Sequence, residues 1–177
     1  RSTARNFFST LTSQKFNWRP NRGRWSIAQC LTHLTISSKL YSGAILTAIS
    51  SAQPVWKVES GPYQYGLVSR MMIKSLDPDN RRRYKAPRKF TPPLIHYSVD
   101  SVITEFESSG DRWEECLKCS NGLNLAKVKV TSPVISLLRF QLGATFAMMV
   151  MHERRHLQQA QTVTTTAGFS DLPLEDS

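Results

Sequence analysis

The chain has 177 residues, of which 40% are hydrophobic, and it carries a formal net charge of +10. This length and apolar content are typical of one folded domain and exclude an intrinsically disordered chain. No apolar run reaches the roughly 18 residues of a membrane-spanning helix, so we expect no membrane partner. The positive charge leaves nucleic acid or a small anionic ligand as candidate partners.

The N-terminal part predicts a short helix followed by a loop. The stretch "ARNFFSTL" is apolar at helical spacing, as at the end of a helix. Pro20 and Gly23 interrupt the periodicity of "FNWRPNRGRW" and predict a loop. Residues 1–24 hold six basic residues and no acidic one, so this end of the chain is strongly positive.

A long second helix is expected from about residue 26 to 50. In "SIAQ", the Ser26 hydroxyl can accept a hydrogen bond from the amide three residues on, and Gln29 can reach back to the Ser26 amide. This capping box marks the start of the helix. A stripe of apolar residues then recurs at helical spacing: Ile27, Leu31, Leu34, Tyr41, Ala44 and Ala48.

Residues 52–97 read as a long connection, because they hold six of the nine prolines. Within it, "GLVSRMMIKSL" predicts a short extra helix, and "RRRYKAPRKFTPP" predicts an extended segment, since a proline disfavours helix at the residue before it. Apolar periodicity predicts a third helix over about 98–119. After a turn at "NGLNL" and a short extended "AKVKV", a fourth helix is expected to begin with Ser132 as its cap and Pro133 in its first turn, and to end near residue 163.

These elements predict an all-α protein, a four-helix bundle with a long crossover between helices two and three. A crossover of this length lets helices two and three run parallel. We expect one domain over residues 1–163 and a flexible tail over residues 164–177.

The three cysteines, Cys30, Cys116 and Cys119, are too few for a disulfide framework. We therefore expect a reducing, cytoplasmic compartment. Cys116 and Cys119 form a C-x-x-C pair, which lies near the end of a helical pattern and not between a strand and a helix. The position favours ordinary packing over a thioredoxin-like redox role.

Three of the four histidines are expected to meet in this bundle. His152 and His156 lie one turn apart on the fourth helix and so point to the same side. His33 lies about 10 Å from the start of helix two, and His156 lies about 10 Å from the end of helix four. If these helices are antiparallel, the three imidazoles reach the same level and form an open set of nitrogen ligands for Zn, Ni, Co or Fe. His96, in the connection, is left outside this set.

The residues alone leave three classes of function open. The histidines fit a metal-dependent enzyme, and they equally fit a non-catalytic bundle that binds metal for stability or keeps the histidines as relics. The third class is a nucleic-acid-binding module, supported by the net charge and by "RRRYKAPRK". No helix-turn-helix, zinc-finger or aromatic single-strand pattern accompanies the charge, which disfavours this class.

Two blocks, "NWRPNRGRWSIAQCLTHL" and "LLRFQLGATFAMMVMHERRHLQQA", resemble the DinB-like superfamily, and the likeness extends over about residues 16–163. The resemblance implies a four-helix bundle, a homodimer, and a metal triad of one histidine on helix two and an H-x-x-x-H pair on helix four. His33, His152 and His156 occupy these three positions.

The resemblance also implies a reaction class, because some members look like S-transferases that use bacillithiol or mycothiol. A divalent cation lowers the pKa of a bound thiol, as it does for water, so either S-transfer or hydrolysis fits such a site. No catalytic acid or base is identified. The loop before helix two and the end of the crossover reach the same end of the bundle. A positive, aromatic rim is therefore expected there, suited to an anionic thiol or substrate: Trp18, Arg24, Trp25, Arg88, Lys89 and Tyr97.

Overall fold

The structure is a computed structural model that describes residues 2–52, 63–80, 82 and 84–173. In this part of the chain the elements are helices, apart from one two-stranded sheet. They follow in the order α1 (Ser2–Phe8), α2 (Ser13–Asn17), α3 (Ile27–Ser50), α4 (Leu67–Leu76), the 3-10 helix η1 (Arg88–Phe90), α5 (Val99–Cys119), β1 (Lys129–Thr131), β2 (Arg139–Gln141) and α6 (Leu142–Thr164).

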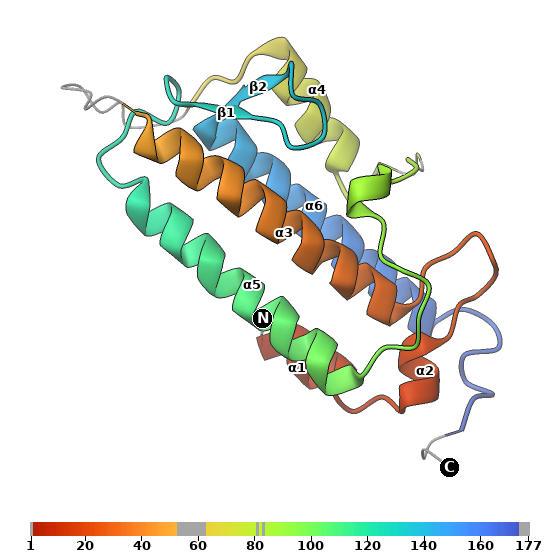
Figure 1. The fold of residues 1–177 in the computed structure, drawn as a ribbon. Helices are drawn as coiled ribbons and strands as arrows, with labels where there is room; N and C mark the ends of the chain where they lie inside the picture. The colour runs from red at the N-terminus through yellow and green to blue at the C-terminus, as the bar shows by residue number, and fades with distance from the viewer. Residues whose placement is uncertain (1, 53–62, 81, 83, 174–177) are drawn as a thin grey trace.

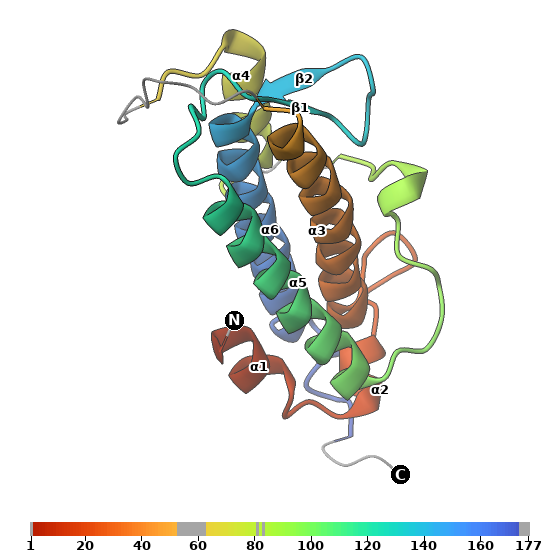
Figure 2. The same ribbon diagram turned by 60° about the vertical axis from the view of Figure 1, so that its left-hand side comes forward.

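The long helices α3, α5 and α6 pack side by side as a bundle (Figures 1 and 2). Figure 1 shows α3 and α5 running parallel and α6 running in the opposite direction. The short α1 and α2 pack across the end where α3 and α5 begin (Figure 2). The predicted all-α bundle with a long crossover is therefore confirmed. No helix of the described residues is long and apolar enough to cross a bilayer.

The apolar core has two parts along the bundle. One cluster lies near the start of α3 and includes Phe16, Leu31 and Phe106, and the other lies near its end and includes Ile45 and Leu142. Fully burying a side chain of this size contributes roughly 1.5–3 kcal/mol. These clusters fix α3 against α6 at both ends, so the level at which their polar residues meet is fixed as well.

The capping box at the start of α3 is present as predicted. The Gln29 amide donates to Ser26 Oγ at 3.1 Å, and the Ser26 amide donates to Gln29 Oε1 at 3.2 Å. The first residue of α3 is Ile27, one residue after the expected boundary. His33 therefore lies almost two turns inside the helix, in its buried part.

The start predicted for the fourth helix, at Ser132 and Pro133, is wrong, because a β-hairpin precedes the helix. Residues 132–141 form the turn and the second strand of a β-ribbon, and α6 begins only at Leu142. Ser132 Oγ accepts from the amides of Val134 and Ile135, so it caps a turn and not a helix. Val130 and Phe140 are paired across the ribbon and both are buried, which holds this stretch extended.

The crossover and the tail agree with their predictions only in part. The extra helix is α4, and the described residues of the proline-rich stretch form the 3-10 helix η1 between non-helical segments, while residues 53–62, 81 and 83 lie outside the described part. In the expected tail, Phe169 is buried and lies edge-on to Trp18, with ring centroids 5.8 Å apart. The chain thus packs on the core beyond α6, and the domain boundary at residue 163 stays a prediction.

Candidate metal centre

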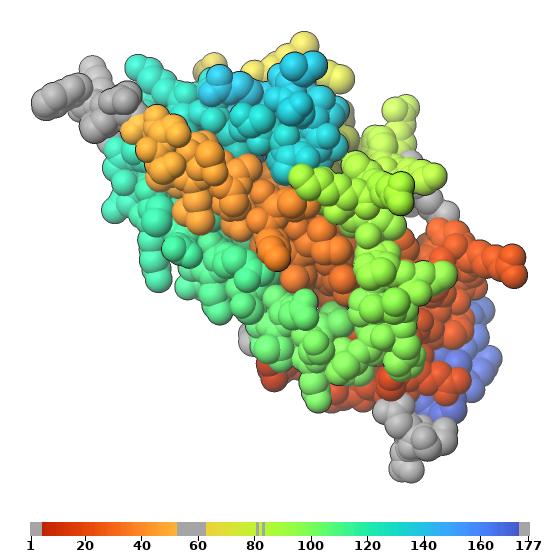
Figure 3. All heavy atoms as spheres, in the orientation of Figure 1, coloured from red at the N-terminus to blue at the C-terminus, as the bar shows by residue number. Residues whose placement is uncertain are grey.

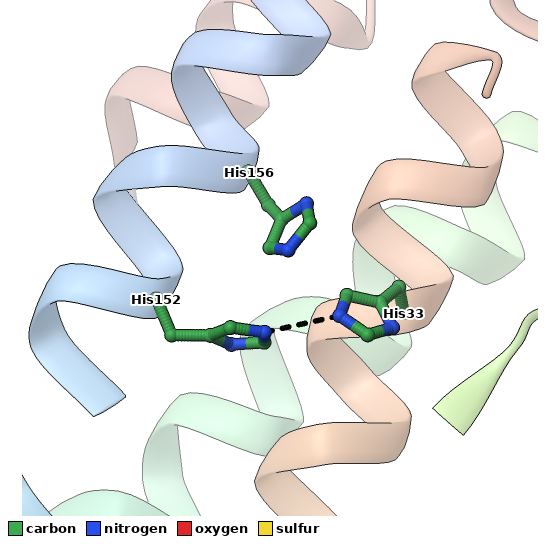
Figure 4. Close-up of side chains that lie close together, drawn as sticks. All are labelled: His33, His152 and His156. Atoms are coloured by element: carbon green, nitrogen blue, oxygen red, sulfur yellow. Dashed lines mark hydrogen bonds between the residues drawn. The ribbon is translucent and has the colours of Figure 1, made fainter. Parts of the chain in front are cut away.

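The imidazoles of His33, His152 and His156 converge between α3 and α6 (Figure 4). His33 Nε2 and His152 Nε2 are 3.0 Å apart, and the three ring centroids are separated by 4.5 to 4.9 Å. One ring nitrogen from each residue lies within 4.8 Å of the others. His33 is buried and the two residues of α6 are half-buried. The antiparallel packing of α3 and α6 thus brings together the three residues that counting along the helices had placed at one level.

Two of the rings are oriented by acceptors on their outer side. His33 Nδ1 donates to the Phe90 carbonyl at 2.7 Å, and His156 Nδ1 donates to Gln159 Oε1 at 2.9 Å. Because both acceptors are oxygens without a proton, each Nδ1 carries the hydrogen and each Nε2 keeps its lone pair. Metal-ligating histidines typically have such outer partners, which fix tautomer and ring direction.

His152 differs from the other two rings. Its Nδ1 is buried and has no hydrogen-bond partner among the described residues. Its Nε2 faces the lone pair of His33 Nε2 at 3.0 Å, so without an ion His152 must donate its proton there. The proton on His152 Nε2 then forms a hydrogen bond to His33 Nε2, while the lone pair of His152 Nδ1 has no donor among the described residues. The protein alone leaves this cluster incompletely satisfied.

Burial keeps the three imidazoles neutral. Desolvation lowers the pKa of His33, although its hydrogen bond to the Phe90 carbonyl acts in the opposite direction. The pKa of His152 lies well below its usual value, because of burial and then the neighbouring charges of His156, His33 and Arg155. Burial, followed by the charge of His33, lowers the pKa of His156 to about 3. Neutral imidazole is the form that binds a metal ion.

The donor set fits a divalent transition metal. Metal–nitrogen bonds of about 2.0–2.1 Å place two neighbouring ligand nitrogens roughly 3.3–3.4 Å apart at tetrahedral angles and roughly 2.9 Å apart at right angles. The 3.0 Å between His33 Nε2 and His152 Nε2 falls between these values. Three protein nitrogens leave coordination positions for water or substrate, as in catalytic zinc sites, whereas structural sites have four protein ligands.

An aromatic side chain covers the cluster. The Trp25 ring stacks on His156 at an interplanar angle of 30° and a centroid distance of 5.7 Å, and its centroid lies 4.8 Å from that of His33. Phe90, in the crossover, bonds His33 through its carbonyl, and its ring contacts that of Tyr41 on α3, with centroids 6.2 Å apart. The loop before α3 and the end of the crossover therefore both reach the imidazoles.

The other expected rim residues lie at different depths. Arg88 and Lys89 are exposed and directly precede Phe90, and Arg24 is half-buried next to Trp25. Their side chains thus start close to residues that touch the histidines. The remaining two belong to the apolar cluster near the start of α3: Tyr97 is buried and donates to the Pro93 carbonyl, and Trp18 packs against Phe169. The role of these residues in binding stays a prediction.

Two contributors to the site were not predicted from the sequence, the Phe90 carbonyl and the Arg155 side chain. The carbonyl of Phe90 has no sequence signal, because any residue supplies one. Gln159 is one turn after His156 on the same face, a spacing that indicates contact. Arg155, between the two histidines of α6, donates to the carbonyls of Asp77 and Asn80 at 2.8 Å each, and so ties the crossover to α6.

Two other candidate features lie outside the cluster. His96 is exposed and its Nε2 is 2.8 Å from Ser13 Oγ, so it does not join the three imidazoles. Cys116 is a buried free thiol with a pKa raised by burial to about 11, and Cys119 is an exposed free thiol. A raised thiol pKa is the opposite of what a thioredoxin-like pair requires.

Comparison with known proteins agrees with this geometry. The family model described as the DinB superfamily matches residues 1–160. Comparisons with curated protein sequences and with solved structures find no significant match.

Proposed function

The chain belongs to the DinB superfamily, and from that premise we propose that it binds one divalent transition metal, Zn, Ni or Fe, through His33, His152 and His156, and acts as a metal-dependent thiol S-transferase. The observation that carries the proposal is the direction of the rings. Two Nε2 lone pairs are aimed at one point by outer hydrogen bonds to Phe90 and Gln159, and the third ring is next to them.

The residues of the chain have separate tasks in this proposal. When bound, a divalent ion supplies a Lewis acid that lowers the pKa of a thiol or a water molecule at the open positions. Phe90 and Gln159 hold the imidazoles in the tautomer that offers Nε2. Trp25 covers two of the rings and keeps water from them. Arg24, Arg88 and Lys89 supply positive charge for an anionic thiol of the bacillithiol type.

Metal binding is tested by measuring metal per chain by mass spectrometry after Zn, Ni or Fe is supplied. We expect one ion per wild-type chain and a loss of affinity by orders of magnitude for His33→Ala, His152→Ala and His156→Ala. The matched control is His96→Ala, which removes a histidine outside the cluster and should retain the ion. A wild-type chain without metal, or full retention by His33→Ala, would show that the triad is not the site.

The thiol part is tested separately, with the metal-loaded protein, bacillithiol or mycothiol, and an aryl halide as electrophile. A sulfur–carbon bond forms as the carbon–halogen bond breaks, and halide and a proton are released. We expect Arg88→Ala with Lys89→Ala to weaken binding of the anionic thiol, more so at low salt, and to leave a neutral thiol unaffected. Full metal occupancy with no reaction and no thiol binding would leave a non-catalytic metal-binding bundle.

The proposal extends to assembly and location. Family membership favours a homodimer, and three free cysteines suit a reducing, cytoplasmic compartment. Sedimentation velocity of the metal-loaded chain tests the dimer, and a purely monomeric protein at high concentration would contradict it.

A further inference from the structure

The end of the bundle away from α1 and α2 exposes many apolar side chains. It is formed by α4 and by the hairpin of β1, β2 and their connecting turn (Figures 1 and 3). Leu137 in the turn is 91% exposed, and Leu67 and Met71 on α4 are 65% and 63% exposed. We call this surface the α4–hairpin face; its exposed apolar residues are Leu67, Val68, Met71, Met72, Val134, Ile135 and Leu137.

The charge of the α4–hairpin face has one sign. Residues 63–76 and 126–141, which form it, contain no Asp or Glu. They contain five basic residues, all of which are exposed: Arg70, Lys74, Lys127, Lys129 and Arg139. Within these two segments the face therefore combines protruding apolar groups with charge that is only positive.

The two elements of the face are fixed to each other by Gln141. Its Oε1 accepts from the Gly66 amide at 3.3 Å, and its Nε2 donates to the Ala126 carbonyl at 3.2 Å. The opposite side of α4 packs on α6 and buries Ser69. The apolar groups of α4 and of the hairpin are thus presented by one connected surface.

A shallow hollow of about 290 Å³ lies where α4 meets the ribbon. Its walls include the apolar Leu67 and Val68 and the basic Lys129 and Arg139. The register pairs Lys129 with Gln141 and Thr131 with Arg139, so both cations lie on the outer side of the ribbon. Two cations next to apolar side chains match the phosphate and the upper acyl chain of a phospholipid.

We propose that the α4–hairpin face docks on the surface of a membrane containing anionic phospholipids. The apolar side chains enter the boundary between headgroups and acyl chains, and the five cations lie at the phosphates. The expectation of no membrane partner rested on the lack of a spanning segment, and a surface-bound face needs none. The inference is independent of the metal centre.

Charge and shape favour this occupant over a protein. In a symmetric dimer through this face, the five cations of one copy would meet the same five of the other, which is destabilising. The apolar groups also protrude from two separate elements, as groups that enter a lipid layer do, whereas protein partners are usually anchored in fitted pockets.

The test is co-sedimentation with vesicles of phosphatidylcholine alone or of phosphatidylcholine with phosphatidylglycerol. We expect binding to the anionic vesicles that weakens with salt, and little binding to the neutral ones. Lys129→Ala with Arg139→Ala should bind roughly 30-fold more weakly. Each cation near an anionic surface contributes about 1 kcal/mol, a factor of roughly five in affinity, and the variant removes two. The control, Lys39→Ala with Arg154→Ala, removes two exposed cations from the middle of α3 and α6 and should retain most of the binding.

The apolar contribution has its own variants. Leu67→Ser with Met71→Ser should bind at least tenfold more weakly, whereas Leu94→Ser with Ile95→Ser removes two comparably exposed side chains elsewhere and should not. In a Leu137→Trp variant, vesicles should shift the added tryptophan emission to the blue.

Several outcomes would overturn the proposal. The first is that wild type does not bind anionic vesicles at low salt. The second is that the control pairs lose as much vesicle binding as the substitutions on the α4–hairpin face. The third is that vesicles leave the emission of the Leu137→Trp variant unshifted. A dimer that the α4–hairpin substitutions abolish, without vesicle binding, would assign the face to a second copy of the chain. Circular dichroism of each variant verifies that the helices are retained.

Discussion

Replacing Gln159 by leucine should weaken metal binding without removing a ligand. In the structure, Gln159 Oε1 accepts from His156 Nδ1 at 2.9 Å in a half-buried position. Leucine keeps the volume and the helix propensity but leaves the Nδ1–H without an acceptor. An unpaired buried donor costs about 1–3 kcal/mol. This range agrees with the roughly 10–100-fold losses of affinity seen when outer partners of metal-bound histidines are removed.

The assay for Gln159→Leu is a competition titration of Zn against a coloured chelator, with thermal unfolding of the metal-free protein measured in parallel. Gln159→Glu keeps an acceptor and should bind at least as tightly as wild type. Gln158→Leu changes an exposed neighbour and should have no effect. If Gln159→Leu binds zinc within twofold of wild type, the outer hydrogen bond does not orient His156 for a metal.

Three further predictions concern the metal-free protein. Because His156 has a folded pKa of about 3, below the unfolded value near 6.5, the unfolded chain binds more protons between these values. The contribution of His156 to the free energy of unfolding is therefore fully present above pH 6.5 and should fall on acidification by about 1.4 kcal/mol per pH unit, as urea titrations at several pH values would show. Arg155→Ala should open the crossover near residues 75–80 to limited proteolysis, whereas Arg154→Ala, at an exposed position, should not; equal cleavage would contradict the anchoring role. Ser26→Ala should lower the free energy of unfolding by about 0.5–2 kcal/mol, since it removes a buried helix cap, and an unchanged urea midpoint would contradict this.

The parts of the fold that obey a local rule could be predicted from the sequence. The start of α3 follows from the Ser26–Gln29 capping box, and the bounds of α5 follow from apolar periodicity. The joint level of His33 and His156 follows from counting residues along helices of fixed rise. The prediction of a joint level also needed α3 and α6 to run in opposite directions, which the length of the crossover indicates.

The start of α6 could not be predicted in the same way. "SP" is a common helix opening, and nothing local distinguishes it from the turn that Ser132 caps here. The deciding interaction is the pairing of Val130 with Phe140, which buries both side chains. Such a pair is visible only when the two segments are known to be adjacent, because strand pairing is a tertiary interaction.

The crossover orients the imidazole of His33, and the same segment determines where the basic residues near the cluster lie. Helices α3 and α6 alone bring three imidazoles together but leave the tautomer of His33 undetermined. The Phe90 carbonyl determines it, and that carbonyl is fixed because the Phe90 side chain is buried and contacts Tyr41. Arg88 and Lys89 directly precede this anchored residue, so the burial of Phe90 fixes where their backbone lies. Substituting these two exposed cations should therefore change the charge near the histidines without changing their geometry, which is the property that makes the paired rim variant a clean test of anion binding.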